Sequence, residues 1–333
     1  MDLSTITEVR TVHLRSTGMS DFELCPRKFL FRHRAGLVPR STGSPALARG
    51  DIFHRIIASI LVGDDPLVAE RKAHERMEEL RFGLAKHVGP AGYLPNGSTP
   101  EEAAKALESN TLVAIAMSRA YRRFHQVGTW TIAGLRVLEG SVEVPITAEE
   151  DGRLDCVVVD RNNHTYVLDH KTCSWNLTQY ARTLPLSAQT LIYPRLLTRF
   201  LVGLPGCQAS GICYCIIKTP SIRCSRVDDF SLAKYAKRVE EWYEENPNDT
   251  MLRTFIRPSH ELIKLSVGRL AAAHHAAVRV PNVADFPGTG GSACQAYNTL
   301  CPYLSLCTTD TARWPQELAR FDRSWRDDPE ETD

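Results

Sequence analysis

The chain has 333 residues, of which 43% are apolar and 24% charged, so it can bury a sizeable core and does not have a disordered composition. Its formal net charge of +1 excludes a globally basic protein, so any nucleic acid must be bound by a local groove. The sequence contains no run of 18 apolar residues, and its start, MDLSTITEVRTVHLRSTG, lacks the apolar core of a signal peptide. We therefore expect a cytoplasmic protein outside the membrane, whose ten cysteines bind metal or are buried rather than forming disulfides.

The first half of the chain is predicted to be mostly helical. Residues 19–36 have the pattern of a short helix, and residues 46–64 that of an amphipathic helix. A longer helix is predicted over 98–128, where Thr99 is the expected N-cap and Glu102 is placed for a capping box.

The second half alternates between strand and helix patterns. Three β-branched segments, GLRVLEGSVEVPIT, GRLDCVVVD and TYVLDHKTC, are separated by turn sequences and predict an antiparallel run of three strands within 134–173. Helices are expected over 184–203, 228–246 and 259–279, with a further strand over 209–219. These elements predict an α/β fold, in which a small mixed sheet carries the functional site, helices flank it and a helical region is inserted before it. The expected segments are an N-terminal segment (1–44), a helical region (45–130), the core (131–280), a cysteine segment (281–310) and a tail (311–333).

Two carboxylates and a lysine on neighbouring strands form the strongest chemical signal. Asp155 heads one apolar strand, and Asp169 lies on the next strand with Lys171 two positions later, on the same strand face. Pairing of the two strands brings Asp155 near Asp169, and adjacent carboxylates are stabilised by a hard divalent cation such as Mg²⁺. A neighbouring lysine can orient a metal-bound water or stabilise charge on a phosphorane-like centre. The alternative is that both aspartates end strands in solvent and Lys171 pairs with one of them.

Other side chains have both a functional and a structural interpretation. Gln189 and Tyr193 are four positions apart on one helical face. His54 is either a metal ligand or a packed histidine, and Trp175 either stacks on a base or packs. Two glutamates either add a carboxylate to the site or are solvated at a strand edge: Glu139 and Glu143. Basic residues on two helices form either phosphate contacts or solvated faces: Arg27, Lys28, Arg32, Arg34, Arg119, Arg122 and Arg123.

The segment SACQAYNTLCPYLSLC contains Cys294, Cys301 and Cys307, one thiolate fewer than a tetrahedral metal or iron–sulfur site requires. Cys25 is the expected fourth ligand, because it lies in an aromatic and basic helix outside the strands. Four thiolates suit zinc or a 4Fe–4S cluster, and the ligand set alone does not decide between them. The remaining cysteines are expected to be buried small apolar residues: Cys156, Cys173, Cys207, Cys213, Cys215 and Cys224.

Six motifs in order give the sequence a resemblance to the PD-(D/E)XK nuclease superfamily, and within it to the RecB-like and CRISPR-associated exonuclease branch. The motifs lie between residues 20 and 307: SDFELCPRKF, GDIFHR, GRLD, LDHKT, QTLIY and CQAYNTLCPYLSLC. Six residues lie between Cys294 and Cys301, where the best-known members of the branch have two; the five residues between Cys301 and Cys307 match the branch.

The resemblance implies a set of metal ligands: Asp155, Asp169, His54 and the backbone carbonyl of His170. It also implies that Lys171 positions the attacking water, and that Gln189 and Tyr193 hold the DNA strand or that water. It favours a 4Fe–4S cluster over zinc at the cysteines, with the structural role of joining the N-terminal helix to the C-terminus.

The function that the resemblance implies is a Mg²⁺- or Mn²⁺-dependent DNA exonuclease that acts on ends or single strands in recombination or DNA processing, alongside a recombination or helicase protein. The alternatives are an endonuclease or CRISPR spacer-trimming nuclease of the same fold, a catalytically silent DNA-binding subunit, or a zinc-stapled interaction protein in which the aspartates are incidental.

Overall fold

The chain forms two compact units in a computed structural model that describes residues 16–39, 45–85, 94, 98–145, 151–204, 206–228, 230–279, 288–298 and 300–323. The first, here called the terminal unit, comprises Met1–Ser41, Pro145–Asp151 and His260–Asp333. The second, called the core unit, comprises Thr42–Val144 and Gly152–Ser259.

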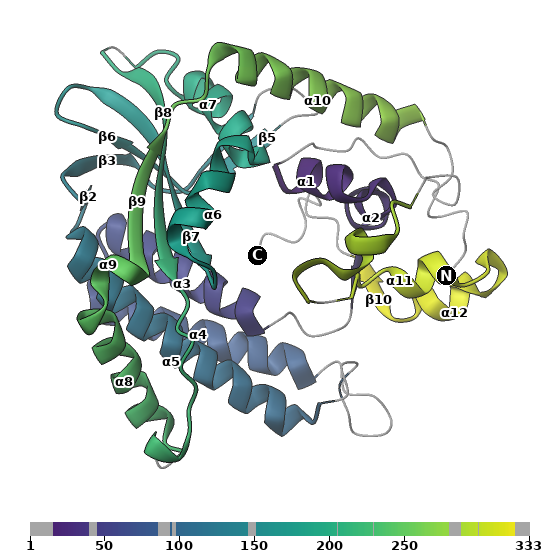
Figure 1. Ribbon diagram of the computed structural model, residues 1–333, viewed down its shortest axis with the longest axis horizontal. Coiled ribbons are helices and arrows are strands. Elements are labelled where there is room, and N and C mark those ends of the chain that lie inside the picture. Colours follow the sequence, from purple (N-terminus) through teal and green to yellow (C-terminus); the bar gives the residue numbers. More distant parts are fainter. Residues whose placement is uncertain are drawn as a thin grey trace. The chain divides into compact units, whose positions relative to one another are not determined.

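A mixed six-stranded sheet organises the core unit, with strand order β2-β3-β6-β7-β8-β9 (Figure 1). Its strands are β2 (Thr131–Ile132), β3 (Leu135–Glu139), β6 (Cys156–Val159), β7 (His164–Cys173), β8 (Gln208–Lys218) and β9 (Met251–Ile256). The central pair, β7 and β8, is parallel, and every other neighbouring pair in this sheet is antiparallel. The predicted α/β class with a small mixed sheet is confirmed.

Helices cover both faces of this sheet. They are α3 (Pro45–Leu61), α4 (Pro66–Ala85), α5 (Pro100–His125), α6 (Leu177–Thr183), α7 (Ala188–Phe200), α8 (Leu232–Glu245) and α9 (Pro247–Thr250), with short 3-10 turns η3 (Leu184–Leu186) and η4 (Arg226–Asp228). On one face, apolar side chains of α3, α5 and α8 share a buried cluster with sheet residues such as Leu168 and Cys213. On the other face, Thr190 of α7 bonds Tyr214 of β8. The two faces of β7 therefore meet different helices.

The start of α5 follows the prediction from its sequence. Thr99 is the N-cap, its side chain accepts from the backbone N–H of Glu102, and Glu102 accepts in return from the backbone N–H of Thr99 at 2.9 Å. This capping box satisfies two of the N–H groups that a helix start leaves unpaired.

Three sequence predictions are corrected. The helix expected over 19–36 is broken into α1 (Ser16–Leu24), α2 (Pro26–Phe29) and a π-helical turn, η2 (Leu30–Arg34), because a residue before proline avoids the helical region and Cys25 is extended. The first two predicted strands are each split, so that β4 (Val142–Pro145) and β5 (Asp151–Leu154) form a separate two-stranded sheet. Finally, the edge strand β9 was not predicted.

The terminal unit joins segments from both ends of the chain. Its C-terminal elements are α10 (His260–Arg279), η6 (Gly291–Asn298), α11 (Leu304–Thr308), η7 (Thr311–Arg313), α12 (Trp314–Leu318) and β10 (Phe321–Arg323). Strand β1 (Leu37–Pro39) pairs antiparallel with β10. The Tyr303 hydroxyl donates to the carbonyl oxygen of Leu37 at 2.7 Å, and its ring stacks on Phe31 at 5.5 Å.

No helix in the described part of the chain is both long and apolar enough to cross a membrane. The last ten residues of the expected tail, 324–333, lie outside the described residues.

Candidate active site

Asp169 and Lys171 form a buried ion pair on one face of β7. Asp169 is fully buried, and the Lys171 Nζ lies 2.6 Å from its Oδ2 atom. Among the described residues, no donor meets either Asp169 carboxylate oxygen with hydrogen-bond geometry, although the Lys171 ammonium is within contact distance. Burial raises the pKa of Asp169. Burial lowers the pKa of Lys171, but the charge of Asp169 outweighs it and keeps that pKa above its usual value, so Lys171 is cationic at neutral pH.

Asp155 lies at the break between β5 and β6, beside His54 of α3. The two are joined by a contact of 3.6 Å between His54 Nδ1 and Asp155 Oδ2, and about a third of each side chain is exposed. Burial raises the pKa of Asp155, but the hydrogen bond and charge of His54 lower it, and the net shift of that pKa is downward. The charge of Asp155 in turn contributes to the raised pKa of Asp169. The structure thus brings His54, Asp155, Asp169 and Lys171 together at one place.

His170 points to the opposite face of β7. Its ring Nδ1 lies 2.7 Å from the hydroxyl of Tyr121 on α5. The ring is 2% exposed, and burial lowers the pKa of His170 to about 3, so the imidazole is neutral at physiological pH. The His170 side chain therefore anchors the strand from behind, between the two residues whose side chains form the ion pair.

Gln189 and Tyr193 share one face of α7, as their spacing predicts. Gln189 Nε2 donates to the Tyr193 hydroxyl at 2.9 Å. Burial raises the pKa of Tyr193, and the charges of Asp169 and Asp155 raise it further. These side chains therefore lie within electrostatic reach of the two carboxylates.

Tyr214 of β8 belongs to this site and was missed in the sequence. It is the register partner of Asp169 across the parallel β7–β8 pair, and the Lys171 Nζ lies 5.8 Å from its ring centroid. Its hydroxyl is 2.7 Å from the Thr190 Oγ1 atom of α7. Period-two alternation separates Tyr214 from its neighbours Cys213 and Cys215, but only the unpredicted parallel pairing aligns it with Asp169.

The donor chemistry of the site suits a hard divalent cation. Asp155 and Asp169 supply carboxylate oxygens, and His54 adds an imidazole. The oxygens of Asp169 are buried and receive no well-formed hydrogen bond from the residues that the structure describes. Within the described ranges, no group of three or more His, Cys, Asp or Glu side chains already converges as a metal site. The residues therefore fit such an ion by type and charge.

The four cysteines of the expected staple gather in the terminal unit. Burial raises the pKa of the Cys301 thiol, and the nearby thiols of Cys25 and Cys294 add to the rise. Burial likewise raises the pKa of Cys307, with Cys301 and Cys25 contributing. All four thiols are free. Their number and type fit a zinc ion or an iron–sulfur cluster, although no three of them converge as a preformed site.

Cys25 differs from Cys301 and Cys307 in the direction of its pKa shift. Burial raises the pKa of its thiol, but hydrogen bonds from Thr289 and from the backbone N–H groups of Lys28 and Arg27, at the start of α2, lower it overall. A lowered pKa favours the thiolate, which is the form that binds metal.

Two arginines of α5 form ion pairs with neighbouring helices. Arg119 pairs with Glu70 at 2.7 Å and with Glu240 at 2.8 Å, and Arg123 pairs with Glu244 at 2.8 Å. These contacts cross between helices, so carboxylates of α4 and α8 partly neutralise the two arginines.

The basic residues around Cys25 are similarly engaged. Lys28 and Arg32 bind the buried carboxylate of Asp21 at 2.7 and 3.1 Å, and Arg34 is 1% exposed. In contrast, Trp175 is 56% exposed beyond the end of β7, and its ring meets that of Tyr180 edge to face with centroids 6.4 Å apart. The Glu139 residue is exposed as strand-edge solvation predicts, and the side chain of Glu143 lies outside the described residues. Four of the six remaining cysteines are buried, whereas Cys207 and Cys224 are only half-buried.

A family model described as the PD-(D/E)XK nuclease superfamily matches residues 16–308. None of the curated proteins searched matches the chain.

Proposed function

Because the chain belongs to the PD-(D/E)XK nuclease superfamily, whose members are metal-dependent nucleases acting on DNA, we propose that it is a Mg²⁺- or Mn²⁺-dependent DNA exonuclease of the RecB-like branch. Its substrates are DNA ends or single strands in recombination or DNA processing. The observation that carries the proposal is the buried Asp169–Lys171 pair, 2.6 Å apart, with Asp155 and His54 beside it.

The metal would be held by Asp155, Asp169, His54 and the backbone carbonyl of His170. When bound, a divalent ion polarises the scissile phosphate and makes an attacking water more acidic. The raised pKa of buried Asp169 reflects the cost of an ionised carboxylate in the apolar interior, and a cation offsets that cost.

Lys171 contributes a fixed positive charge. Its ammonium is held against Asp169 and over the ring of Tyr214, and its raised pKa means that it donates hydrogen bonds rather than accepting a proton. In this role Lys171 orients the attacking water and stabilises the extra negative charge on the phosphate oxygens.

The Gln189–Tyr193 pair and Trp175 orient the strand. The phenol of Tyr193 remains protonated because burial and the carboxylates raise its pKa, so it can donate to a phosphate oxygen. Trp175 presents an exposed ring two residues beyond the end of β7, where a base can stack.

For the terminal unit we propose a 4Fe–4S cluster on Cys25, Cys294, Cys301 and Cys307, with zinc as the alternative. The proposal is supported by the mutual pKa effects of these thiols and by their free state. Its role is structural, since β1 and β10 already pair in the same unit and a metal would strengthen that connection.

The proposal is tested by digesting two substrates, end-labelled linear single-stranded DNA and circular single-stranded DNA. Each is digested with Mg²⁺ and with Mn²⁺. An exonuclease degrades the linear strand and leaves the circle intact. Cleavage of the circle would replace the exonuclease with an endonuclease, and DNA binding without hydrolysis would indicate a silent subunit.

Substitution of the site residues ties the activity to this site. Asp155→Ala, Asp169→Ala and Lys171→Ala should each lower turnover at least about a hundredfold while the fold stays intact. Glu139→Ala, which removes an exposed carboxylate from β3, is the matched control and should retain activity. Full activity in Asp169→Ala would contradict the assignment.

A further inference from the structure

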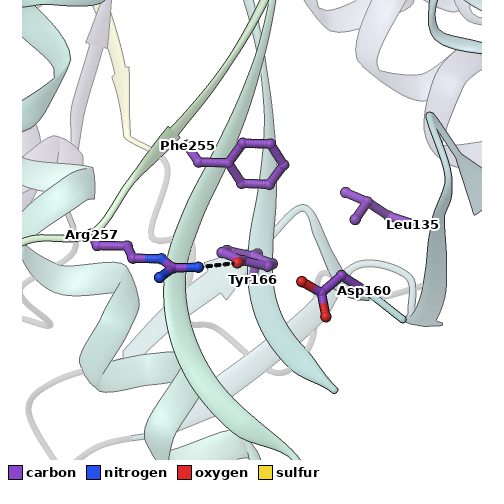
Figure 2. Close-up of a pocket in the computed structure, with 5 residues that line it drawn as sticks. All are labelled: Leu135, Asp160, Tyr166, Phe255 and Arg257. Carbon is purple, nitrogen blue, oxygen red and sulfur yellow. Dashed lines mark hydrogen bonds between the residues drawn. The ribbon is translucent and has the colours of Figure 1, made fainter. Parts of the chain in front are cut away.

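A pocket lies on the core unit, away from the Asp169 site. It has a volume of about 480 Å³, within the range of about 300–1,000 Å³ typical of small-molecule sites, and is lined by Leu135, Asp160, Tyr166, Phe255 and Arg257 (Figure 2). Tyr166 precedes Asp169 by three positions on β7, so alternation directs the two side chains to opposite faces of the sheet. Nothing in the proposed hydrolysis uses this pocket.

Two aromatic rings form its wall. The rings of Tyr166 and Phe255 meet edge to face, with centroids 5.0 Å apart and planes at 66°. Tyr166 is 3% exposed, whereas Phe255 is 44% exposed although it lies on a strand of the central sheet. An exposed ring held in place by a buried one is a rigid surface on which a flat group can stack.

Two arginines lie beside these rings. Arg257 donates from its guanidinium to the Tyr166 hydroxyl at 2.6 Å, and the Arg253 guanidinium lies 5.7 Å from the Phe255 ring centroid (Figure 2 shows Arg257). In the part of the chain that the structure describes, neither arginine forms an ion pair with a carboxylate, unlike Arg238, which binds Asp228 at 2.6 Å. Arg253, Phe255 and Arg257 follow one another at intervals of two positions, so an aromatic ring lies between two cationic side chains in the sequence.

The backbone is shaped to build this pocket. Between Thr165 and Tyr166 the register against β8 shifts by one residue, and Gly211 becomes the partner of Tyr166. Gly211 has φ +129°, and a Cβ atom there would clash with the carbonyl oxygen of Ile256. Only glycine therefore lets the end of β9 approach closely enough for Arg257 to reach the Tyr166 hydroxyl.

Asp160 supplies a fixed acceptor at the same pocket. Its Oδ1 atom accepts from the backbone N–H groups of Asn162 and His164 at 2.8 and 2.9 Å. Burial raises the pKa of Asp160, but these hydrogen bonds outweigh it and lower that pKa overall. An ionised carboxylate beside an aromatic ring can accept from the amino group or ring N–H of a nucleobase.

We propose that this pocket is a nucleotide-binding subsite, in which a base stacks on Phe255 and presents its edge to Asp160 while its phosphate binds Arg257. Combined stacking and cationic contacts are the usual basis for binding single strands without strong sequence preference. This subsite plays no part in the proposed hydrolysis. It rests on the proposed function only because a nuclease makes a nucleotide the expected ligand. The nucleotide is either part of a bound strand or a free mononucleotide, and the two sources share this chemistry.

Binding to a single strand is measured in EDTA, so that failure of hydrolysis does not affect the result. The probe is a fluorescein-labelled single-stranded 12-mer, followed by anisotropy at several salt concentrations. Phe255→Ala and Arg257→Gln should each raise Kd roughly tenfold, and Arg257→Gln should lower the salt slope by about 0.7, the value for one phosphate contact of a single strand. Phe82→Ala and Arg71→Gln, which alter exposed residues of α4, are the matched controls and should leave Kd unchanged.

A second arm separates strand from free nucleotide and does not depend on variant stability. Calorimetry with dCMP and dTMP reports mononucleotide binding, and photocrosslinking of an iodouracil-containing 12-mer to the wild-type protein reports where a strand lies. Mononucleotide binding that Phe255→Ala abolishes, without a change for the 12-mer, would assign the pocket to free nucleotide. Crosslinks to the peptide containing Phe255 would assign it to a strand. The proposal is overturned if both folded variants bind 12-mer and mononucleotides as the wild type does and no crosslink reaches that peptide.

Discussion

The Tyr121 hydroxyl and the His170 ring Nδ1 are 2.7 Å apart, in a contact that joins α5 to the strand carrying Asp169 and Lys171. Both side chains are buried, and the two rings meet at 78° with centroids 5.5 Å apart. Because His170 lies between the two residues of the ion pair, this contact fixes β7 from its far face. Tyr121 is therefore a positioning residue for a site that it does not touch.

Replacing Tyr121 by phenylalanine should lower kcat roughly tenfold and leave KM for DNA nearly unchanged, because a lost buried hydrogen bond costs about 1–1.5 kcal/mol and here loosens the His170 carbonyl. The metal concentration for half-maximal rate should rise. Steady-state kinetics over a range of Mg²⁺ concentrations checks both values. A lower melting temperature with unchanged kcat and metal dependence would show that Tyr121 stabilises the fold and does not position the site.

His54 is expected to ligate the metal through the ring that now contacts Asp155 at 3.6 Å. His54→Ala should lower activity most at low metal concentration, and excess Mn²⁺ should restore part of it, because Mn²⁺ accepts nitrogen ligands more readily than Mg²⁺. Rate measurements at matched concentrations of the two ions test this. His74→Ala on α4 is the control. Equal losses at every concentration of either ion would argue against a ligand role for His54.

Local chemistry made part of this site predictable. Period-two alternation places Asp169 and Lys171 on one face of a strand, and helical spacing places Gln189 beside Tyr193. Each of these relationships is fixed by neighbouring residues of one element, so the sequence contains it directly. The α5 capping box at Thr99 is of the same kind.

Long-range pairing explains what was missed. Tyr214 faces Asp169 only because β7 and β8 run parallel, and a parallel pair leaves no turn signal between its strands. Tyr121 and His170 are 49 positions apart, and Arg257 and Tyr166 are 91 positions apart. Such contacts depend on the tertiary fold and have no local pattern from which to predict them.

The carboxylate of Asp21 should make the stability of the terminal unit depend on pH in acid. Burial raises its pKa, but hydrogen bonds from His33 and Lys28 outweigh this and lower the pKa from 3.8 to about 2. A carboxyl whose folded pKa is depressed stabilises the fold above its unfolded pKa, and that contribution is lost as pH falls through the folded value. Asp21 therefore contributes about 2 kcal/mol above pH 4, and this contribution disappears towards pH 2.

Urea unfolding of the wild type and Asp21→Asn measures this contribution. The difference in unfolding free energy between the two proteins should be about 2 kcal/mol at pH 5 and shrink towards zero near pH 2. Subtracting the two unfolding free energies cancels the contributions of the other carboxylates that titrate in the same pH range. A difference for Asp21→Asn that does not change with pH would contradict the ion cluster around Asp21.

Cys25 is the residue on which the metal staple depends. It lies between α1 and α2 in an extended conformation, with its thiol pKa lowered by the first backbone N–H groups of α2 and by Thr289. The other thiols that it meets, Cys301 and Cys307, come from more than half the chain length away. A metal bound by these residues closes a long loop and removes conformational entropy from the unfolded chain, although that gain grows only slowly with loop length.

Protein purified without oxygen should therefore be brown and contain about four irons per chain. Cys25→Ser should lose the colour and the iron and lower the melting temperature by roughly 5 °C or more. Cys207→Ser, which removes a half-buried thiol of the core unit, should keep the colour and the iron. Colourless protein with one zinc per chain would replace the cluster and keep the staple. Full metal content in Cys25→Ser would show that the Cys25 thiol is not needed to bind the metal and would contradict the staple.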